Sequence, residues 1–187
     1  MSKRAVSQEE YKALIDDASY LQDEAEALQY VIEEVPYRDV PTESLSIYQR
    51  LKKVDHAQTS FYRPIVEDVL SSKHSLQLGR YNSIDETFEP EEAEEKIDVQ
   101  KTLRKIIKHR AALINLFQQI PLIDWEQELT DEKGRERTLF EFVQSMITFE
   151  RNELKQIADL VLIYQKEKRT QREIDAKSNA RQDLNGE

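Results

Sequence analysis

The sequence contains no cysteine, three glycines and five prolines among its 187 residues. Without cysteine the chain has no disulfide, no thiolate nucleophile and no cysteine-ligated zinc site, so any thiol chemistry needs an external thiol. Few glycines and prolines, together with 34% charged residues, are typical of a mostly helical protein with few tight turns. No apolar stretch approaches the roughly 20 residues of a membrane span, and the N-terminus lacks the apolar segment of a signal peptide. We therefore expect a soluble, cytoplasmic, all-α protein.

Acidic residues outnumber basic residues. The chain has 37 Asp and Glu against 27 Lys and Arg, and its net charge of −10 repels nucleic-acid phosphates. The one strong basic cluster has the spacing of an outer helix face, which favours a solvated surface over a nucleic-acid site. The cluster comprises Lys101, Arg104, Lys105, Lys108 and Arg110. We expect neither nucleic acid nor a membrane among the partners of this protein.

Apolar residues recur at intervals of three and four in four segments, which is the spacing of a helix with one buried face. The segments are residues 8–34, 43–71, 90–120 and 138–168. Ser7 and Glu10 predict a capping box for the first helix, Thr42 is expected to cap the second, and Pro90 is expected to open the third. The length suits one domain, so we expect a single four-helix bundle over residues 1–187. Residues 170–187 lose the apolar seam and are expected to form a charged, frayed tail.

Two connections and one proline shape this bundle. Residues 73–89 lose the helical period, which predicts a long crossover between the second and third helices. Residues 122–137 carry a turn signal and are expected to hold a short turn or hairpin. Pro64 has no N–H to donate to Ser60, so we expect a kink in the second helix near this proline rather than a break.

The last helix carries two acidic residues in its buried seam, because the helical spacing falls on Glu150 and Glu153. A buried carboxylate without a partner is unstable unless it takes up a proton, so these acids predict either a partner or a solvent-filled pocket. Arg110 is the off-pattern residue of the third helix, and antiparallel helices with level ends place it at the depth of Glu150. We therefore expect Arg110 to pair with one of the two acids. Asp55 and Gln58 interrupt the apolar face of the second helix and complete the expected buried polar cluster.

Two stretches of the sequence carry a family resemblance. The first is RLKKVDHAQTSF, with His56 two residues after Val54. The second is WEQELTDEKGRERTLFEFVQSMITFERNELKQI, in which Gln156 and Ile157 set the register. The first resembles the second helix, and the second resembles the link and last helix, of the DinB-like (DinB/YfiT-type) family of four-helix bundles. The resemblance implies a four-helix bundle with a long crossover between its second and third helices.

Many members of this family bind a divalent metal through one histidine of the second helix and an H-x-x-x-H pair in the last. By that register the corresponding positions here are His56, Phe149 and Glu153. Phenylalanine has no ligand atom, and one histidine with one carboxylate falls short of the three protein ligands that zinc and transition metals usually need. We therefore expect no cofactor. The alternative is that His56, Glu150 and Glu153 together hold zinc, nickel, iron or manganese.

The incomplete ligand set favours a metal-free bundle that binds a small molecule or a partner. The alternative is a divalent-metal-dependent enzyme that resembles the family's transferases that use small thiols, so the enzymatic status stays open. A ferritin-like di-iron oxidase is excluded, because it needs Glu-x-x-His motifs and the sequence has none. His56 also has a plain structural interpretation as a surface histidine beside the apolar face of its helix.

A homodimer is the last expectation. The family resemblance favours it, and three tyrosines lie on the first helix outside its apolar seam: Tyr11, Tyr20 and Tyr30. Single exposed aromatic residues are common on ordinary protein surfaces, so these tyrosines alone do not distinguish a dimer from a monomer.

Overall fold

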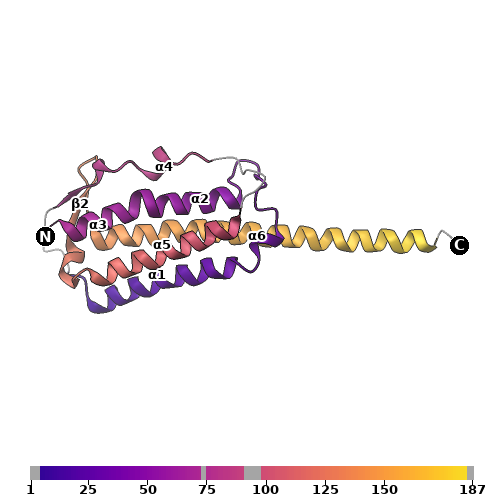
Figure 1. The fold of residues 1–187 in the computed structure, drawn as a ribbon, viewed down its shortest axis with the longest axis horizontal. Coiled ribbons are helices and arrows are strands. Elements are labelled where there is room, and N and C mark those ends of the chain that lie inside the picture. The colour runs from indigo at the N-terminus through magenta and orange to yellow at the C-terminus, as the bar shows by residue number, and fades with distance from the viewer. Residues whose placement is uncertain (1–4, 73–74, 91–97, 185–187) are drawn as a thin grey trace.

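In the computed structural model, four long helical segments lie side by side and form a bundle (Figure 1). The structure describes residues 5–72, 75–90 and 98–184, with side chains up to residue 179. The long helices are α1 (Gln8–Leu28), α2 (Ile47–Ala57) continued by α3 (Arg63–Ser71), α5 (Val99–Gln119) and α6 (Leu139–Leu184). A long crossover joins α3 to α5, so the predicted all-α four-helix bundle is confirmed.

The first and last long helices of the chain pack against each other. α1 and α6 run in the same direction, and α2, α3 and α5 run in the opposite direction (Figure 1). The buried face of α1 packs against α5 and α6, and α2 packs against the same two helices. The first helix of the chain is therefore covered by the last two.

α1 begins with the predicted capping box, in which Ser7 and Glu10 each accept a hydrogen bond from the backbone N–H of the other. The helix ends at Leu28 rather than near residue 34. The chain then turns into a single 3-10 turn, η1 (Ile32–Glu34), and Ile32 is still fully buried. Pro36 excludes Val35 from helical backbone, so the chain leaves the bundle after this turn.

The second helix begins at Ile47 rather than near residue 43. Glu43 adopts left-handed backbone with a φ of 56°, which does not fit a right-handed helix, so Thr42 is not the cap. Ser46 caps the helix instead, and Gln49 completes a capping box with it.

The second helix then passes Pro64 without a break. Residues Gln58–Tyr62 form a π turn, η2, after which the N–H of Arg63 donates to the carbonyl of Gln58, five residues earlier. The wider turn accommodates the missing N–H of Pro64 and leads directly into α3. The irregularity predicted at this proline therefore takes the form of a π turn.

The third helix begins later than predicted. Its first residue is Val99, and the Asp98 side chain caps it by accepting a hydrogen bond from the N–H of Lys101. Pro90, the predicted first residue, is not helical, and residues 91–97, which were expected to continue the helix, lie outside the described residues.

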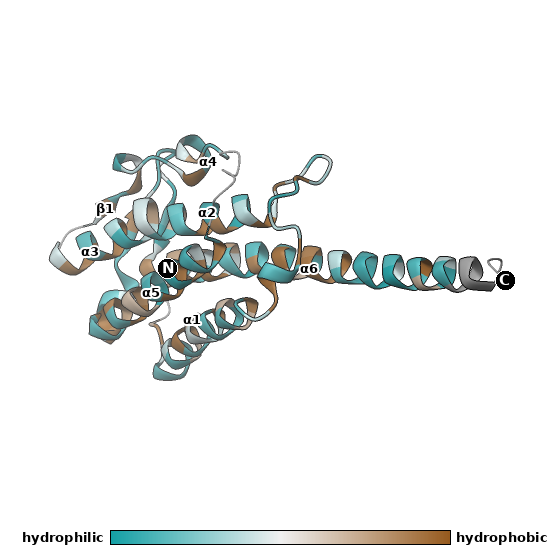
Figure 2. Ribbon diagram, turned by 45° about the vertical axis from the view of Figure 1, so that its right-hand side comes forward, coloured by the Kyte–Doolittle hydropathy of each residue, from teal (hydrophilic) through white to brown (hydrophobic). Residues whose placement is uncertain are grey.

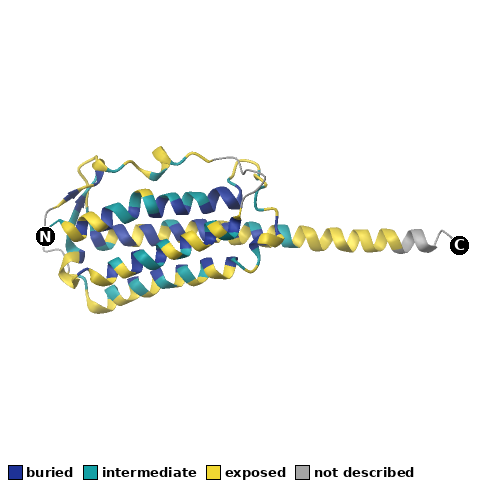
Figure 3. Cartoon of the chain, in the orientation of Figure 1, coloured by how far each residue is buried: buried dark blue, intermediate teal, exposed yellow. Residues whose placement is uncertain are grey.

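The fourth helix is longer than predicted, because α6 continues to Leu184 instead of ending near residue 168. Residues 166–179 are all exposed and extend beyond the bundle (Figure 3). Hydrogen bonds between side chains one turn apart, such as Gln171 with Asp175, support this part of the helix. The fraying expected for residues 170–187 stays a prediction.

A small three-stranded sheet closes one end of the bundle. β1 (Leu76–Gln77), from the crossover, pairs in parallel with β2 (Glu128–Thr130), which pairs antiparallel with β3 (Glu136–Thr138). The β2–β3 pair is the predicted hairpin, and Gly134 supplies the positive φ of 72° that its turn requires. The crossover also contains the short turns η3 (Leu78–Arg80) and α4 (Ile84–Thr87). The sheet ties the crossover to the start of α6.

The core lies between the four helices and extends under this sheet. Trp125, from the 3-10 turn η4 (Leu122–Glu126), is fully buried and contacts the rings of Tyr11 and Phe117 at centroid distances of 5.6 and 5.9 Å. Tyr11 is therefore a half-buried packing residue, whereas Tyr20 and Tyr30 are 57% and 84% exposed. Hydrophobic residues are concentrated in the bundle and sparse on the far part of α6 (Figure 2). No helix among the described residues is long and apolar enough to cross a membrane.

Candidate functional site

The acids in the seam of α6 are buried and paired. Glu150 and Arg110 are each 1% exposed, and the Arg110 guanidinium forms an ion pair with the Glu150 carboxylate. Gln58, from the π turn, donates a hydrogen bond of 3.2 Å to the same carboxylate. Burial lowers the pKa of Arg110, because the charged guanidinium is removed from water. The π turn, α5 and α6 thus meet in one interior polar cluster.

Glu153, almost one turn further along α6, is held by two other cations. Arg50 Nη1 donates to Glu153 Oε2 at 2.8 Å, and the Lys53 ammonium lies 3.3 Å from Oε1. Lys53 also lies 3.7 Å from a carboxylate oxygen of Asp85 in α4 and 5.5 Å from the centre of the Phe149 ring. Both carboxylate oxygens of Glu153 therefore have a cationic partner supplied by α2.

Asp55 belongs to a third group, on the side of α2 that faces α5. Lys105 Nζ lies 2.7 Å from Asp55 Oδ2, and His109 Nδ1 lies 3.3 Å from Oδ1. Burial lowers the pKa of His109, although the neighbouring Asp55 acts in the opposite direction. The structure therefore brings Arg110, Glu150 and Gln58 together, and it places Glu153 and Asp55 in separate clusters.

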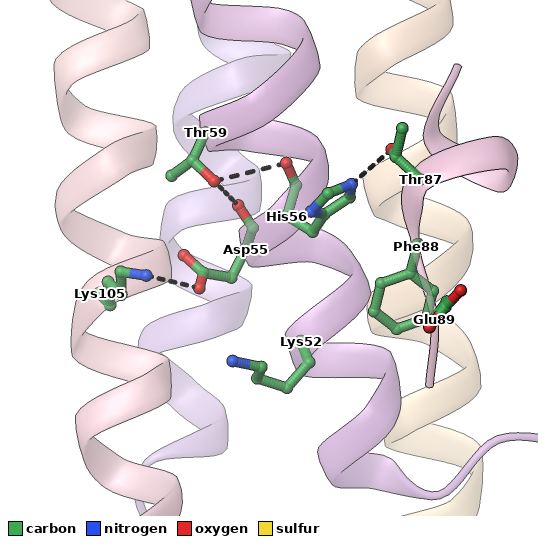
Figure 4. A pocket seen from close by; sticks show the side chains of 8 residues that line it. All are labelled: Lys52, Asp55, His56, Thr59, Thr87, Phe88, Glu89 and Lys105. Carbon is green, nitrogen blue, oxygen red and sulfur yellow. Dashed lines mark hydrogen bonds and ion pairs between the residues drawn. The ribbon is translucent and has the colours of Figure 1, made fainter. Parts of the chain in front are cut away.

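The residues assigned to a metal by the family register do not converge. His56 Nε2 lies 2.7 Å from Thr87 Oγ1, and the imidazole packs against Phe88 with 5.9 Å between ring centroids (Figure 4). The α2 residue that faces both Glu153 and Phe149 is Lys53, three residues before His56. Among the described residues, no three His, Asp or Glu side chains lie close enough to hold a metal ion.

An ammonium group therefore lies at the position that the resemblance assigns to a divalent metal. Lys53 and Arg50 neutralise Glu153, and their positive charge repels a further cation. Phe149 adds an aromatic face rather than a ligand atom. The residues present do not fit a divalent metal at this position.

Arg50 and Lys53 were not predicted as site residues, although their spacing in the sequence could have indicated them. They are three residues apart on α2, a spacing that places them on one face of the helix beside its apolar seam. The two buried acids of α6 need cationic partners, and Arg110 pairs with only one of them, Glu150. Basic residues flanking the seam of the second helix were the remaining candidates.

A surface pocket of about 420 Å³ opens beside His56 (Figure 4). Its lining comes from α2, α5 and the end of the crossover: Lys52, Asp55, His56, Thr59, Thr87, Phe88, Glu89 and Lys105. Lys105 is paired with Asp55, whereas Lys52 has no ion-pair partner in the described part of the chain. The pocket thus offers the Lys52 ammonium group, an imidazole, hydroxyl groups and an aromatic ring, together with the carboxylates of Asp55 and Glu89.

Comparisons with known proteins bear on the fold. Neither a protein-family sequence model nor a curated protein sequence matches this chain. Among solved structures the chain is similar to YfiT from Bacillus subtilis, described as a probable metal-dependent hydrolase with an unusual four-helix bundle topology. The match covers 86% of this chain and 90% of YfiT, with a TM-score of 0.68 and 10% sequence identity. This likeness shows that the chain has the DinB/YfiT-type four-helix-bundle fold.

Proposed function

We propose that this protein is a binding protein built on the DinB/YfiT-type fold, which works without a resident metal and takes a small polar ligand in the pocket beside His56. The observation that carries the proposal is the pairing of Glu153 with Arg50 and Lys53. A carboxylate already bonded to two cations has little affinity for a third. The fold is retained, and the position for a metal is filled by side chains of the chain itself.

The chemistry of the pocket indicates the class of ligand. Lys52 supplies positive charge for an anionic group, and the hydroxyl groups of Thr59 and Thr87 line the same pocket. The Phe88 ring offers a flat apolar surface at the other side of the pocket (Figure 4). We propose a small carboxylic acid with an apolar or aromatic portion as the ligand.

Benzoate and phenylacetate are suitable probes for this pocket. We expect each to bind weakly, with a Kd on the order of 1 mM, as is usual for a fragment with one charged contact. Lys52→Ala should weaken binding about tenfold, because hydrogen bonds to a charged group are worth about 1.5–3 kcal/mol. Isothermal titration calorimetry measures both effects.

The matched control for this variant is Lys108→Ala, which removes an exposed lysine of α5 that does not line the pocket. It should leave the affinity for both probes unchanged. Absence of binding by both probes, or equal affinity of Lys52→Ala and the parent protein, would contradict the assignment of this pocket.

Metal analysis tests the other half of the proposal. Protein purified without added metal should contain zinc, nickel, iron and manganese far below one ion per chain, because Glu153 is engaged by Arg50 and Lys53. Near-stoichiometric metal that disappears in Glu153→Ala but persists in Glu141→Ala, an exposed acid of α6, would overturn the metal-free function.

A divalent-metal-dependent enzyme, resembling the thiol-dependent transferases of the DinB-like family, is the second candidate. The likeness to YfiT favours it, because that protein is described as a probable metal-dependent hydrolase. This function requires Arg50 and Lys53 to release Glu153 when a metal binds. The metal analysis described above distinguishes the two candidates.

A further inference from the structure

The last part of α6 is an exposed helix. Near residue 165 it leaves the bundle and continues to Leu184, and residues 166–179 are all exposed (Figures 1 and 3). At its base Lys168 donates a hydrogen bond of 3.3 Å to the carbonyl of Glu34. An isolated helix of this length is only marginally stable in water, so a surface that covers one side would stabilise it. We call residues 165–184 the α6 extension.

The α6 extension is basic in an acidic protein. Its residues 165–179 contain five Lys and Arg and three Asp and Glu, whereas the whole chain carries a net charge of −10. Ile163, Glu167, Thr170 and Ile174 recur at intervals of four and three, so they lie along one side of the helix. Ile163 and Ile174 are 50% and 54% exposed. This side combines two exposed isoleucines with one acid, Glu167, and it is flanked by Lys166 and Lys177.

The outer face of α1 is complementary to the α6 extension. Gln8–Leu28 contains seven acidic residues and one lysine. An exposed stripe opposite the buried seam recurs at intervals of three and four: Ala13, Asp16, Tyr20, Asp23, Ala27 and Tyr30. It combines small and aromatic side chains, which a helix can pack against, with carboxylates that attract basic residues. We call these six residues the α1 outer stripe.

We propose that the α1 outer stripe binds the α6 extension of a second copy of this chain, and that two copies form a symmetric dimer by exchanging their extensions. The lengths match, because α1 has 21 residues and the extension 20, and both span about 30 Å at 1.5 Å per residue. Two extensions packed against each other would instead bring like charges together. Charge and length therefore both favour α1 of the second copy.

The symmetry of the exchange follows from the fold. The α6 extension projects past the end of its own bundle, so it reaches α1 of another copy only if the two-fold axis is perpendicular to α6 (Figure 1). α1 and α6 run in the same direction within one chain. The two-fold rotation therefore sets each extension antiparallel to the α1 that it contacts, an arrangement in which the helix dipoles attract. The proposed interface does not use the pocket beside His56.

Light scattering coupled to gel filtration tests the dimer. The parent protein should show a mass of about twice the 22.1 kDa of one chain at micromolar concentration. Reversing charge on the stripe, D16K/D23K, or on the two lysines that flank the isoleucine side of the extension, K166E/K177E, should weaken association about tenfold or more, because like charges then face each other. K101E/K108E, which reverses two exposed lysines of α5, is the matched control and should remain dimeric.

Mixing the two reversal variants gives the sharpest result. A mixed pair contains one copy of each variant, so each stripe then meets an extension of opposite charge. An equimolar mixture of D16K/D23K and K166E/K177E should therefore recover the dimer. Far-UV circular dichroism verifies that both variants remain folded. A parent mass near 22.1 kDa, a dimer that neither reversal weakens, or a mixture that stays monomeric would each overturn the proposal.

Discussion

Replacing Arg110 by alanine is expected to lower the free energy of unfolding by about 3–5 kcal/mol, because it leaves the buried Glu150 carboxylate without its cation. For a domain of this size the loss corresponds to a decrease in Tm on the order of 10 °C. The deficit should shrink at acid pH, where the stranded carboxyl group takes up a proton. Thermal and urea unfolding of the parent protein and Arg110→Ala, followed by circular dichroism, measure the difference.

Two further variants show whether this loss comes from the stranded charge. Arg104→Ala, an exposed arginine on the same helix, should change stability by less than about 0.5 kcal/mol. Replacing both partners, as Arg110→Leu with Glu150→Leu, should recover much of the loss, because a buried ion pair is often no more stabilising than apolar residues of similar volume. Gln58 then loses its acceptor, so full recovery is not expected. An Arg110→Ala protein that melts like the parent would contradict the buried ion pair.

Replacing Lys53 and Phe149 together by histidine is expected to create a metal site beside Glu153. The two imidazoles and the Glu153 carboxylate then provide three ligands, and removal of the Lys53 ammonium removes one of the cations paired with Glu153. We expect zinc content to rise from below detection to about one ion per chain, because three protein ligands and a water satisfy zinc. Atomic spectroscopy after dialysis measures this content.

The control variants for this metal site identify its ligands. Lys53→Ala with Phe149→Ala removes the same side chains without adding imidazoles and should bind no zinc. Adding His56→Ala to the histidine variant should leave zinc bound, because His56 faces Thr87 rather than Glu153. If His56→Ala abolishes zinc binding, then His56 and not residue 53 faces the metal position.

Much of the fold follows from local spacing. The apolar period of each long helix is a property of consecutive residues, and the bundle is the ordinary way for four such faces to be buried together. Helix ends depend on finer detail. The left-handed backbone of Glu43 prevents the second helix from beginning there, and the sequence around this glutamate does not predict a left-handed conformation. The apolar pattern does not predict the end of α6 either, because residues 166–179 are helical without being buried.

The polar clusters were only partly predictable for a different reason. Arg110 and Glu150 stand out because each interrupts an apolar seam, and level helix ends place them at one depth. The choice between His56 and Lys53 depends on the rotation of α2 about its own axis, which residue spacing alone does not fix. The π turn at Gln58–Tyr62 adds one residue to a turn of this helix. The side chains of α2 are therefore rotated by about 100° about the helix axis relative to those of α3, compared with a regular helix. A register carried over from another sequence does not include that rotation.

The packing of α1 against α5 and α6 affects how this protein folds during its synthesis on the ribosome. α1 is made first, yet the helices that cover its apolar face begin at Val99 and Leu139. At about 5–20 residues per second, the nascent chain presents that face uncovered for on the order of 10 s. The bundle therefore closes only after most of the chain has been synthesised, and fragments released before α6 is made expose a hydrophobic surface to chaperones and proteases.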